Sequence, residues 1–254
     1  MFPRMIRYLS SSIENRILAS FSNVALAGES LVENHLGDAL ILAWRIFVKR
    51  GVDILFSGVL LIICIPLFIL FACLIKMTSS GPIFFKQERV GYKGKTFRIW
   101  KFRTMYQENS VEDHQQYIRY LLREGSESES RVDLLTKYID HVESRITPVG
   151  KFLRATSLDE LPQLINIFKG DMTLVGPRPH PVYEVEEYKE WYRRRLSVKP
   201  GLTGWSKLNL RCTPKNYEES ILYDLWYVDH WCLSLDFKIL LMTIPFVIGM
   251  KDAR

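Results

Sequence analysis

The sequence predicts a mostly helical α/β protein that carries one membrane segment. The uninterrupted apolar sequence lies almost entirely in residues 52–75, which is enough to reach into a bilayer. Helical patterns occupy much of the remaining chain. Short β-prone runs occur at residues 83–87, 96–102 and 172–175. The near-zero mean hydropathy therefore averages a membrane segment with a polar domain.

The charge and the cysteines narrow the class of protein. The 254 residues contain 34 Lys and Arg against 28 Asp and Glu, a net charge of +6. This excess indicates an anionic partner, which could be nucleic acid, acidic lipid or a phosphorylated substrate. The four cysteines have no C-x-x-C spacing and two lie in the apolar segment, so neither a disulfide framework nor a zinc site is indicated. We expect a domain in a reducing, cytosol-facing compartment.

Residues 1–47 are expected to form an N-terminal extension without a secretory signal, because no compact apolar core precedes a small-residue cleavage site. From residue 31 apolar side chains recur at helical spacing, and Trp44 suits a bilayer interface. The pattern predicts an interfacial helix leading into the membrane. Ordinary helical packing explains the same spacing.

Residues 48–76 are predicted to form a re-entrant membrane helix. Pro66 lies near the middle, where it breaks the hydrogen-bond ladder and can turn the chain back at depth. Basic residues flank both ends, which is typical of a cytoplasmic side. A single span is the alternative. Asp53 is expected to pair with Lys49 or Arg50, one helical turn earlier.

The runs at 83–87 and 96–102, joined through Gly91 and Gly94, predict a basic hairpin close to the membrane. A nucleotide-binding P-loop at Gly94-Lys-Thr96 is excluded, because that motif needs a glycine where the chain has Arg89. Residues 107–144 are charged and contain a polar Gly-Ser-Glu run, which predicts an insertion of two exposed helices around a loop.

Residues 156–170 place two carboxylates, Asp159 and Glu160, where a helix is predicted to begin. Pro162 belongs in a first helical turn and Gly170 is a C-terminal stop, so about three turns should bury Leu161, Leu164, Ile165 and Phe168. The helix start would keep a carboxylate ionised and attract phosphate. A capping box between Ser157 and Glu160, without catalysis, is the competing interpretation.

The last third of the chain contains a stiff turn and three predicted helices. Gly176-Pro-Arg-Pro179 follows the strand at 172–175 and holds the Arg178 guanidinium in place, either for phosphate or only in solvent. Helices are predicted at 182–196, from Thr213-Pro214 through Tyr217, Asp224 and Tyr227, and at 237–250 with a break at Pro245. The last should lie on the membrane or pack under the domain.

Set in order, these residues resemble a known family. The motifs are Phe84-Phe-Lys-Gln-Glu-Arg-Val-Gly91, Lys101-Phe-Arg-Thr-Met105, Ser157-Leu-Asp-Glu-Leu-Pro-Gln163, Gly176-Pro-Arg-Pro179 and Pro200-Gly-Leu-Thr-Gly-Trp205. They are similar to those of the bacterial sugar transferases, the monotopic polyprenyl-phosphate phosphoglycosyl transferases. The likeness covers about residues 48–248. One departure is Ile65-Pro66, where the family usually has Ser-Pro, so a hydroxyl that could satisfy a freed backbone group is missing.

The resemblance implies a monotopic protein of the bacterial inner membrane, with a re-entrant helix, interfacial amphipathic helices and a small α/β catalytic domain, here residues 77–254, facing the cytoplasm. It implies transfer of a sugar phosphate from a UDP-sugar to undecaprenyl phosphate with release of UMP, the first membrane step of polysaccharide or glycoconjugate assembly. Phospholipid would be a partner and nucleic acid would not, and a homo-oligomer is left open. Asp159 would be the nucleophile and Glu160 a ligand of Mg²⁺. Arg178 would hold phosphate, with Arg154 and Lys101 as further candidates and Asp224 in a supporting role.

Two rival functions fit less of the sequence. A metal-dependent glycosyltransferase without a covalent intermediate commonly needs D-x-D, which does not occur in the chain. A basic membrane-associated scaffold or nucleic-acid binder explains the charge but gives no purpose to Asp159-Glu160 or to the turn around Arg178. The identity of the transferred sugar does not follow from the sequence, since hexose discrimination depends on a few hydrogen bonds in a folded pocket.

Overall fold

The computed structural model describes residues 34–106, 142–210 and 217–248. The chain divides into two compact units, Met1–Phe47 and Val48–Arg254. Helix α2 (Asn34–Ile63) begins in the first unit, where the rings of Trp44 and Phe47 stack with centroids 6.0 Å apart. The helix predicted there is confirmed, and its interfacial position stays a prediction. The helices predicted at 107–144 fall almost wholly outside the described residues.

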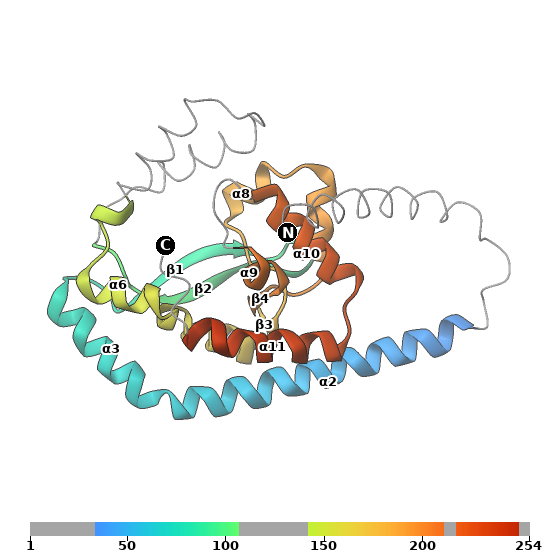
Figure 1. The fold of residues 1–254 in the computed structure, drawn as a ribbon, viewed down its shortest axis with the longest axis horizontal. Helices are drawn as coiled ribbons and strands as arrows, with labels where there is room; N and C mark the ends of the chain where they lie inside the picture. Colours follow the sequence, from blue (N-terminus) through green and yellow to red (C-terminus); the bar gives the residue numbers. More distant parts are fainter. Residues whose placement is uncertain (1–33, 107–141, 211–216, 249–254) are drawn as a thin grey trace, which may run out of the picture. The chain divides into compact units, whose positions relative to one another are not determined.

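The long apolar segment is bent where the sequence predicts a break. Helix α3 (Ile65–Thr78) follows α2 at an angle of 58°, with Pro66 in its first turn (Figure 1). Backbone hydrogen bonds from Cys64 N to Leu60 O and from Phe68 N to Cys64 O, both 2.9 Å, flank Pro66 on either side of the bend. Among the described helices none alone is long and apolar enough to cross a bilayer, whereas this bent pair passes by length and composition.

Two small sheets carry the loops of the site. Strands β1 (Phe84–Val90) and β2 (Thr96–Phe102) pair antiparallel along their whole length, which confirms the predicted hairpin. Strand β3 (Thr173–Val175), also predicted, pairs in parallel with β4 (Gly201–Thr203), which the sequence reading missed. A Cβ on Gly201 would lie 2.0 Å from Gly176 N, so this close strand approach requires glycine.

Short helices connect and cover the sheets. In chain order they are α6 (Pro148–Ala155), the 3₁₀ turn η2 (Leu158–Glu160), α7 (Gln163–Lys169), α8 (Val182–Glu186), the 3₁₀ helix η3 (Glu190–Ser197), α9 (Trp205–Asn209), α10 (Tyr217–Asp229) and α11 (Leu233–Ile248). Thr147 caps α6 by accepting a 2.9 Å hydrogen bond from Gly150 N, as its position predicts.

Two predicted helices differ from the structure. The single helix expected at 182–196 is split into α8 and η3, because the extended backbone of Lys189 turns the chain so that Tyr188 and Tyr192 both pack into the core. Helix α11 continues past Pro245 to Ile248. Since Pro245 lies in its last turn, the proline removes one hydrogen bond without dividing the helix.

The core consists of three neighbouring clusters. The largest joins α7, β3, β2, α10 and α11 through Leu164, Ile167, Val175 and Ile239, among others. A second contains Val90, Val185, Tyr188, Tyr192, Ile221 and Leu225. In the third, Phe71 and Ile75 of α3 pack against Phe102 of β2 and Leu153 of α6. Helix α3 is therefore part of the packed unit.

Three polar residues of α2 hold the same unit together. Lys49 Nζ donates to Val175 O at 2.9 Å and pairs with Asp236 at 2.5 Å. Arg50 donates to the carbonyls of Ile167 and Phe168 at the end of α7, at 2.6 and 2.8 Å. The expected pairing of Asp53 with these two cations is wrong.

Asp53 binds strand β3 instead. Its carboxylate accepts hydrogen bonds from Leu174 N at 2.9 Å and from the Thr173 hydroxyl at 2.7 Å, and the residue is 4% exposed. These bonds satisfy β3 groups that its single parallel neighbour leaves unpaired, and Lys49 and Arg50 are already taken by acceptors of other elements. Sequence spacing within α2 could not reveal a partner about 120 residues away.

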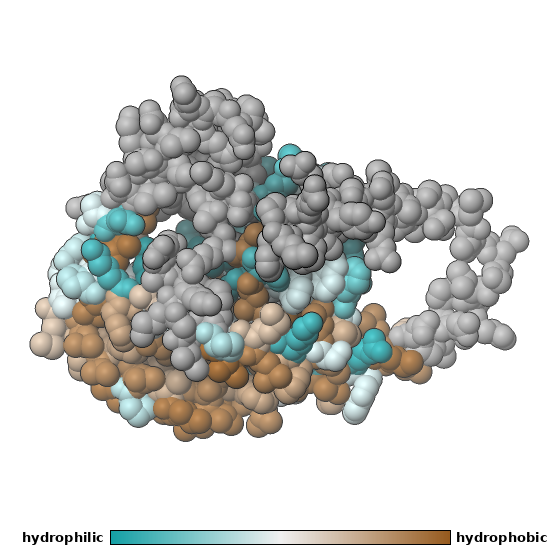
Figure 2. Space-filling view, in the orientation of Figure 1, coloured by the Kyte–Doolittle hydropathy of each residue, from teal (hydrophilic) through white to brown (hydrophobic). Residues whose placement is uncertain are grey.

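Apolar side chains gather outside the core on α2, α3 and α11. Exposed examples include Ile63, Ile65, Ile69, Leu70, Phe237, Leu241 and Ile244. Figure 2 shows a mostly hydrophobic surface in the lower part of the view, where Figure 1 places the second half of α2, α3 and α11. A continuous exposed apolar surface of this kind is typical of a membrane or protein contact.

Candidate active site

The two predicted carboxylates lie in the 3₁₀ turn η2, ahead of the helix that was expected to contain them. Helix α7 begins only at Gln163, with Pro162 as its N-cap residue and Gly170 (φ 96°) as its C-cap. Ser157 takes a left-handed conformation (φ 56°) and makes no capping hydrogen bond from its side chain. The capping box is therefore absent, because the left-handed backbone of Ser157 differs from the extended backbone that an N-cap serine normally has.

The buried face of α7 also differs from the prediction. Leu164 and Ile167 are buried, but Phe168 is 50% exposed and Leu161 and Ile165 are only partly buried. Two amide side chains, Gln163 and Asn166, take buried positions instead. Since a helix of seven residues contributes little dipole to η2, the ionisation of the carboxylates depends on the side chains around them.

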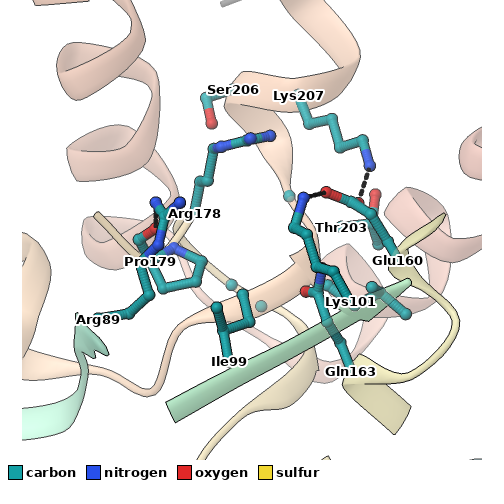
Figure 3. Close-up of a pocket in the computed structure, with 14 residues that line it drawn as sticks. Arg89, Ile99, Lys101, Glu160, Gln163, Arg178, Pro179, Thr203, Ser206 and Lys207 are labelled. Carbon is teal, nitrogen blue, oxygen red and sulfur yellow. Dashed lines mark hydrogen bonds and ion pairs between the residues drawn. The ribbon is translucent and has the colours of Figure 1, made fainter. Parts of the chain in front are cut away.

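Two lysines from other elements hold Glu160. Lys101 of β2 places Nζ 2.7 Å from Glu160 Oε1 and 3.7 Å from Asp159 Oδ2. Lys207 of α9 places Nζ 2.9 Å from Glu160 Oε2 (Figure 3). Each oxygen of Glu160 therefore has its own ammonium partner, whereas Asp159 shares Lys101 at a longer distance.

The same surroundings move the two pKa values in opposite directions. Burial raises the pKa of Asp159 above its usual range, with Lys101 opposing and Glu160 adding to the shift. Burial would also raise the pKa of Glu160, but Lys101, Lys207 and Arg178 outweigh it and hold the pKa well below its usual range. Neighbouring carboxylates with separated pKa values can take different chemical roles.

A pair of arginines forms the opposite wall of the pocket. Arg178 and Arg89 both line it, and Arg89 Nη1 donates to Pro179 O at 3.0 Å. Burial, together with the charge of Arg178, lowers the pKa of Arg89 to about 10, so it remains charged at neutral pH. Figure 3 shows these side chains facing Lys101, Glu160 and Lys207 across the pocket. The charged residues of the lining are four cations and one carboxylate.

Behind this wall Arg195 and Asp224 support the turn. Arg195 is 3% exposed, donates to Arg178 O at 2.7 Å and is hydrogen-bonded to Asp224. The other oxygen of Asp224 accepts a 2.6 Å hydrogen bond from Ser206, which lines the pocket. Burial raises the pKa of Asp224, with Arg195 opposing. This placement is compatible with the supporting role expected for Asp224.

The structure thus brings together only some of the predicted site residues. Lys101, Glu160 and Arg178 line one pocket, and Asp159 lies beside Lys101. Arg154, whose Nε donates to Thr104 Oγ1 at 3.0 Å, and Asp224 lie outside the lining.

Sequence reasoning missed five polar lining residues: Arg89, Gln163, Thr203, Ser206 and Lys207. Arg89 and Gln163 stand inside the quoted motifs, which was the available signal. Lys207 meets Glu160 across 47 residues, and no local pattern indicates that contact.

Glu160 is the one carboxylate in the described pocket lining, so a magnesium ion here would need further ligands from outside the protein. The described residues contain no group of three or more His, Cys, Asp or Glu side chains that could hold a metal alone. Mg²⁺ is usually held by one or two carboxylates together with substrate phosphates. Glu160 already attracts two cationic groups and stays ionised, as a magnesium ligand must.

Comparison with known proteins identifies the type of chain. The family model described as bacterial sugar transferase matches residues 44–250. A UDP-glucose:undecaprenyl-phosphate glucose-1-phosphate transferase of Klebsiella pneumoniae is 39% identical over 203 residues, which are 77% of this chain and 39% of that protein. An undecaprenyl-phosphate galactose phosphotransferase of Salmonella typhimurium is 39% identical over 208 residues, 82% of this chain and 42% of that protein.

A shorter relative matches over most of its length. The uncharacterized sugar transferase EpsL of Bacillus subtilis is 38% identical over 202 residues, which are 79% of this chain and 87% of that protein. The chain therefore spans about two fifths of the length of the first two relatives and most of the third.

Proposed function

The chain belongs to the bacterial sugar transferase family, and from this premise we propose that it is a phosphoglycosyl transferase. It transfers a sugar phosphate from a UDP-sugar to undecaprenyl phosphate and releases UMP. The product is a lipid-diphosphate-linked sugar, the starting point for a polysaccharide or glycoconjugate. Two of the relatives are named for glucose and galactose transfer to undecaprenyl phosphate, which supports this class of reaction.

The observation that carries the proposal is the charge of the pocket. Its lining holds Arg89, Lys101, Arg178 and Lys207 against Glu160 alone, and Asp159 lies at its edge. Adding the charge of Asp159 still leaves two positive charges in excess, which favour a ligand with several negative charges such as the diphosphate of a nucleotide sugar. Preorganised cations of this kind also stabilise the charge that develops on phosphate oxygens during transfer.

The two carboxylates suit a two-step exchange. An Asp159 oxygen attacks the sugar-bearing phosphorus, the bond from that phosphorus to UMP breaks, and an acyl phosphate remains on the protein. An oxygen of undecaprenyl phosphate then attacks the same phosphorus and restores the Asp159 carboxylate. Burial leaves Asp159 poorly solvated and therefore reactive, while Lys101 favours its ionised form. Glu160 would hold Mg²⁺ together with the donor phosphates, and the metal charge would offset theirs.

The exposed apolar surface supports a membrane location. Side chains of α3 and α11 such as Ile69, Leu70 and Phe237 would contact phospholipid and bring the pocket near the acceptor headgroup. With the basic flanks of the membrane segment on the cytoplasmic side, the pocket would face the cytoplasm of a bacterial inner membrane.

The covalent step is tested with Asp159→Asn. This variant nearly preserves shape but removes the attacking anion, so it should abolish UMP release from labelled UDP-sugars under single-turnover conditions, even without acceptor. Wild-type protein should form a protein-bound sugar phosphate that hydroxylamine cleaves. Because the sugar is unknown, a panel of UDP-sugars is used. Asp229→Asn, which alters an exposed ion pair with Arg194, is the control and should behave as wild type.

Two results would contradict this mechanism. An adduct in the asparagine variant would exclude Asp159 as the attached group. No UMP release from wild type until lipid acceptor is added would indicate direct attack by the lipid phosphate instead.

A further inference from the structure

Gln163 is a buried side chain that leaves a hydrogen-bond donor unused. It is the first residue of α7, it is 2% exposed, and it lines the pocket with Lys101 and Glu160. Its Nε2 is buried and has no hydrogen-bond partner in the described part of the chain. Buried amide groups are almost always paired with protein or water, so an unpaired donor at a pocket wall is available to a ligand.

A second amide in the same helix shows what a purely structural role looks like. Asn166 is 1% exposed and lies outside the pocket lining. Its Nδ2 donates to Arg98 O at 2.8 Å and to Asp171 at 3.2 Å, and its Oδ1 accepts from Trp100 N at 3.0 Å. Asn166 therefore connects α7 to β2, and both N–H groups of its side-chain amide are hydrogen-bonded. Gln163, three residues earlier, makes no such connection through its amide nitrogen.

The surroundings of Gln163 indicate the chemistry of its missing partner. Figure 3 shows its amide next to the Lys101 side chain, on the Glu160 side of the pocket. Glu160, whose two oxygens accept from Lys101 and Lys207, receives no hydrogen bond from Gln163 Nε2. A pocket with surplus positive charge favours an anionic acceptor over a neutral one. Phosphate oxygens, which only accept hydrogen bonds, meet this requirement.

We propose that Gln163 binds the donor substrate by donating a hydrogen bond from Nε2 to an oxygen of the phosphate that is transferred. This inference rests on the proposed function and adds a residue to its substrate site. The position beside Lys101 puts the amide on the same side as Asp159, so the bond is to the sugar-bearing phosphate and not to the phosphate that leaves with UMP. Gln163 then helps to orient the phosphorus toward the attacking carboxylate.

The test compares UDP with UMP as ligands of the full chain in detergent. The terminal phosphate of UDP corresponds to the transferred group, and UMP lacks it. Gln163→Met keeps the length of the side chain and removes the donor, so the dissociation constant for UDP should rise about tenfold to a hundredfold. The dissociation constant for UMP should not change. The melting temperature without ligand should stay equal or rise, because an unsatisfied buried donor is removed.

Asn166→Leu is the matched control. It deletes three hydrogen bonds that hold α7, so it should lower the melting temperature and change UDP and UMP binding by the same factor or not at all. The proposal is overturned if Gln163→Met behaves in this way, or if it weakens UDP and UMP equally. If wild-type protein binds neither nucleotide, the proposed function fails first; if it binds both and Gln163→Met retains wild-type affinity for UDP, only the role of Gln163 is rejected.

Discussion

Arg178 is fixed more firmly than a surface arginine. Proline precedes and follows it, and its carbonyl accepts a hydrogen bond from the buried Arg195, so the backbone under the guanidinium has little freedom. Arg89 lies close enough to Arg178 for the repulsion between them to lower the pKa of Arg89. Two like charges held on one pocket wall are stabilised when an anion binds between or against them.

Arg178→Lys should therefore lose much of the activity although it keeps the charge. Lysine offers a point charge in place of a planar fork, and we expect kcat/KM to fall by roughly tenfold to a hundredfold. Steady-state UMP release measures this. Arg193→Lys, at an exposed position paired only loosely with Glu190, is the control. Unchanged kinetics in the Arg178→Lys variant would mean that the turn from Gly176 to Pro179 has a purely structural role.

At the scale of elements, the second half of α2 acts as a support for β3. Asp53 caps two polar groups of this strand, and Lys49 reaches the carbonyl of Val175, the last residue before Gly176 and the Arg178 turn. Ser57, one turn beyond Asp53, is equally buried, but its hydroxyl bonds only to carbonyls of its own helix. Both residues are buried, but only the Asp53 side chain forms hydrogen bonds to another element.

This difference gives a stability prediction. Asp53→Ala leaves Leu174 N and the Thr173 hydroxyl without their acceptor, which should reduce the free energy of unfolding by about 3 kcal/mol. Ser57→Ala should cost about 1 kcal/mol or less, since its helix carbonyls keep their backbone partners. Melting temperatures of the two variants in detergent make the comparison. Equal losses would mean that Asp53 contributes no more than local helix contacts.

Local rules predicted the elements that local chemistry determines. Thr147 and Pro148 begin α6, Gly170 ends α7, and Pro66 marks the bend. The features that the sequence did not predict involve partners far apart in the chain. Strand β4 forms because Gly176 and Gly201 allow two backbones to approach closely. Asp53 binds a strand about 120 residues away and not the neighbouring cations. For the site, the motifs pointed to Asp159, Glu160 and Arg178, while Lys207 had no local signal.

At the scale of the whole molecule, the side of the membrane on which each end lies remains a prediction. We expect the bend at Pro66 to return the chain, so that both flanks of the membrane segment are cytoplasmic. Single cysteines at Ser20 and at the exposed Lys93 turn, in a protein whose native cysteines are replaced, should both resist a membrane-impermeant thiol reagent in intact cells. Both should react after permeabilisation.

The contrary result is equally clear. If the cysteine at Ser20 reacted in intact cells while that at Lys93 did not, the segment would cross the membrane once. Helices α2 and α3, labelled in Figure 1, would then be the two halves of one kinked transmembrane span.

The hydrogen bonds and ion pair that join α2 to the rest of the catalytic unit also affect how a soluble enzyme can be prepared. Work without detergent would be simplest with a fragment that begins after Thr78 and so lacks the apolar helices α2 and α3. Such a fragment would lose the hydrogen bonds of Asp53 to β3, the ion pair of Lys49 with Asp236 and the hydrogen bonds of Arg50 to the end of α7. It would also expose Phe102 and Leu153, against which α3 packs. A better route to a water-soluble enzyme keeps both helices and replaces outward-facing side chains such as Ile62, Ile65 and Ile69 with polar ones.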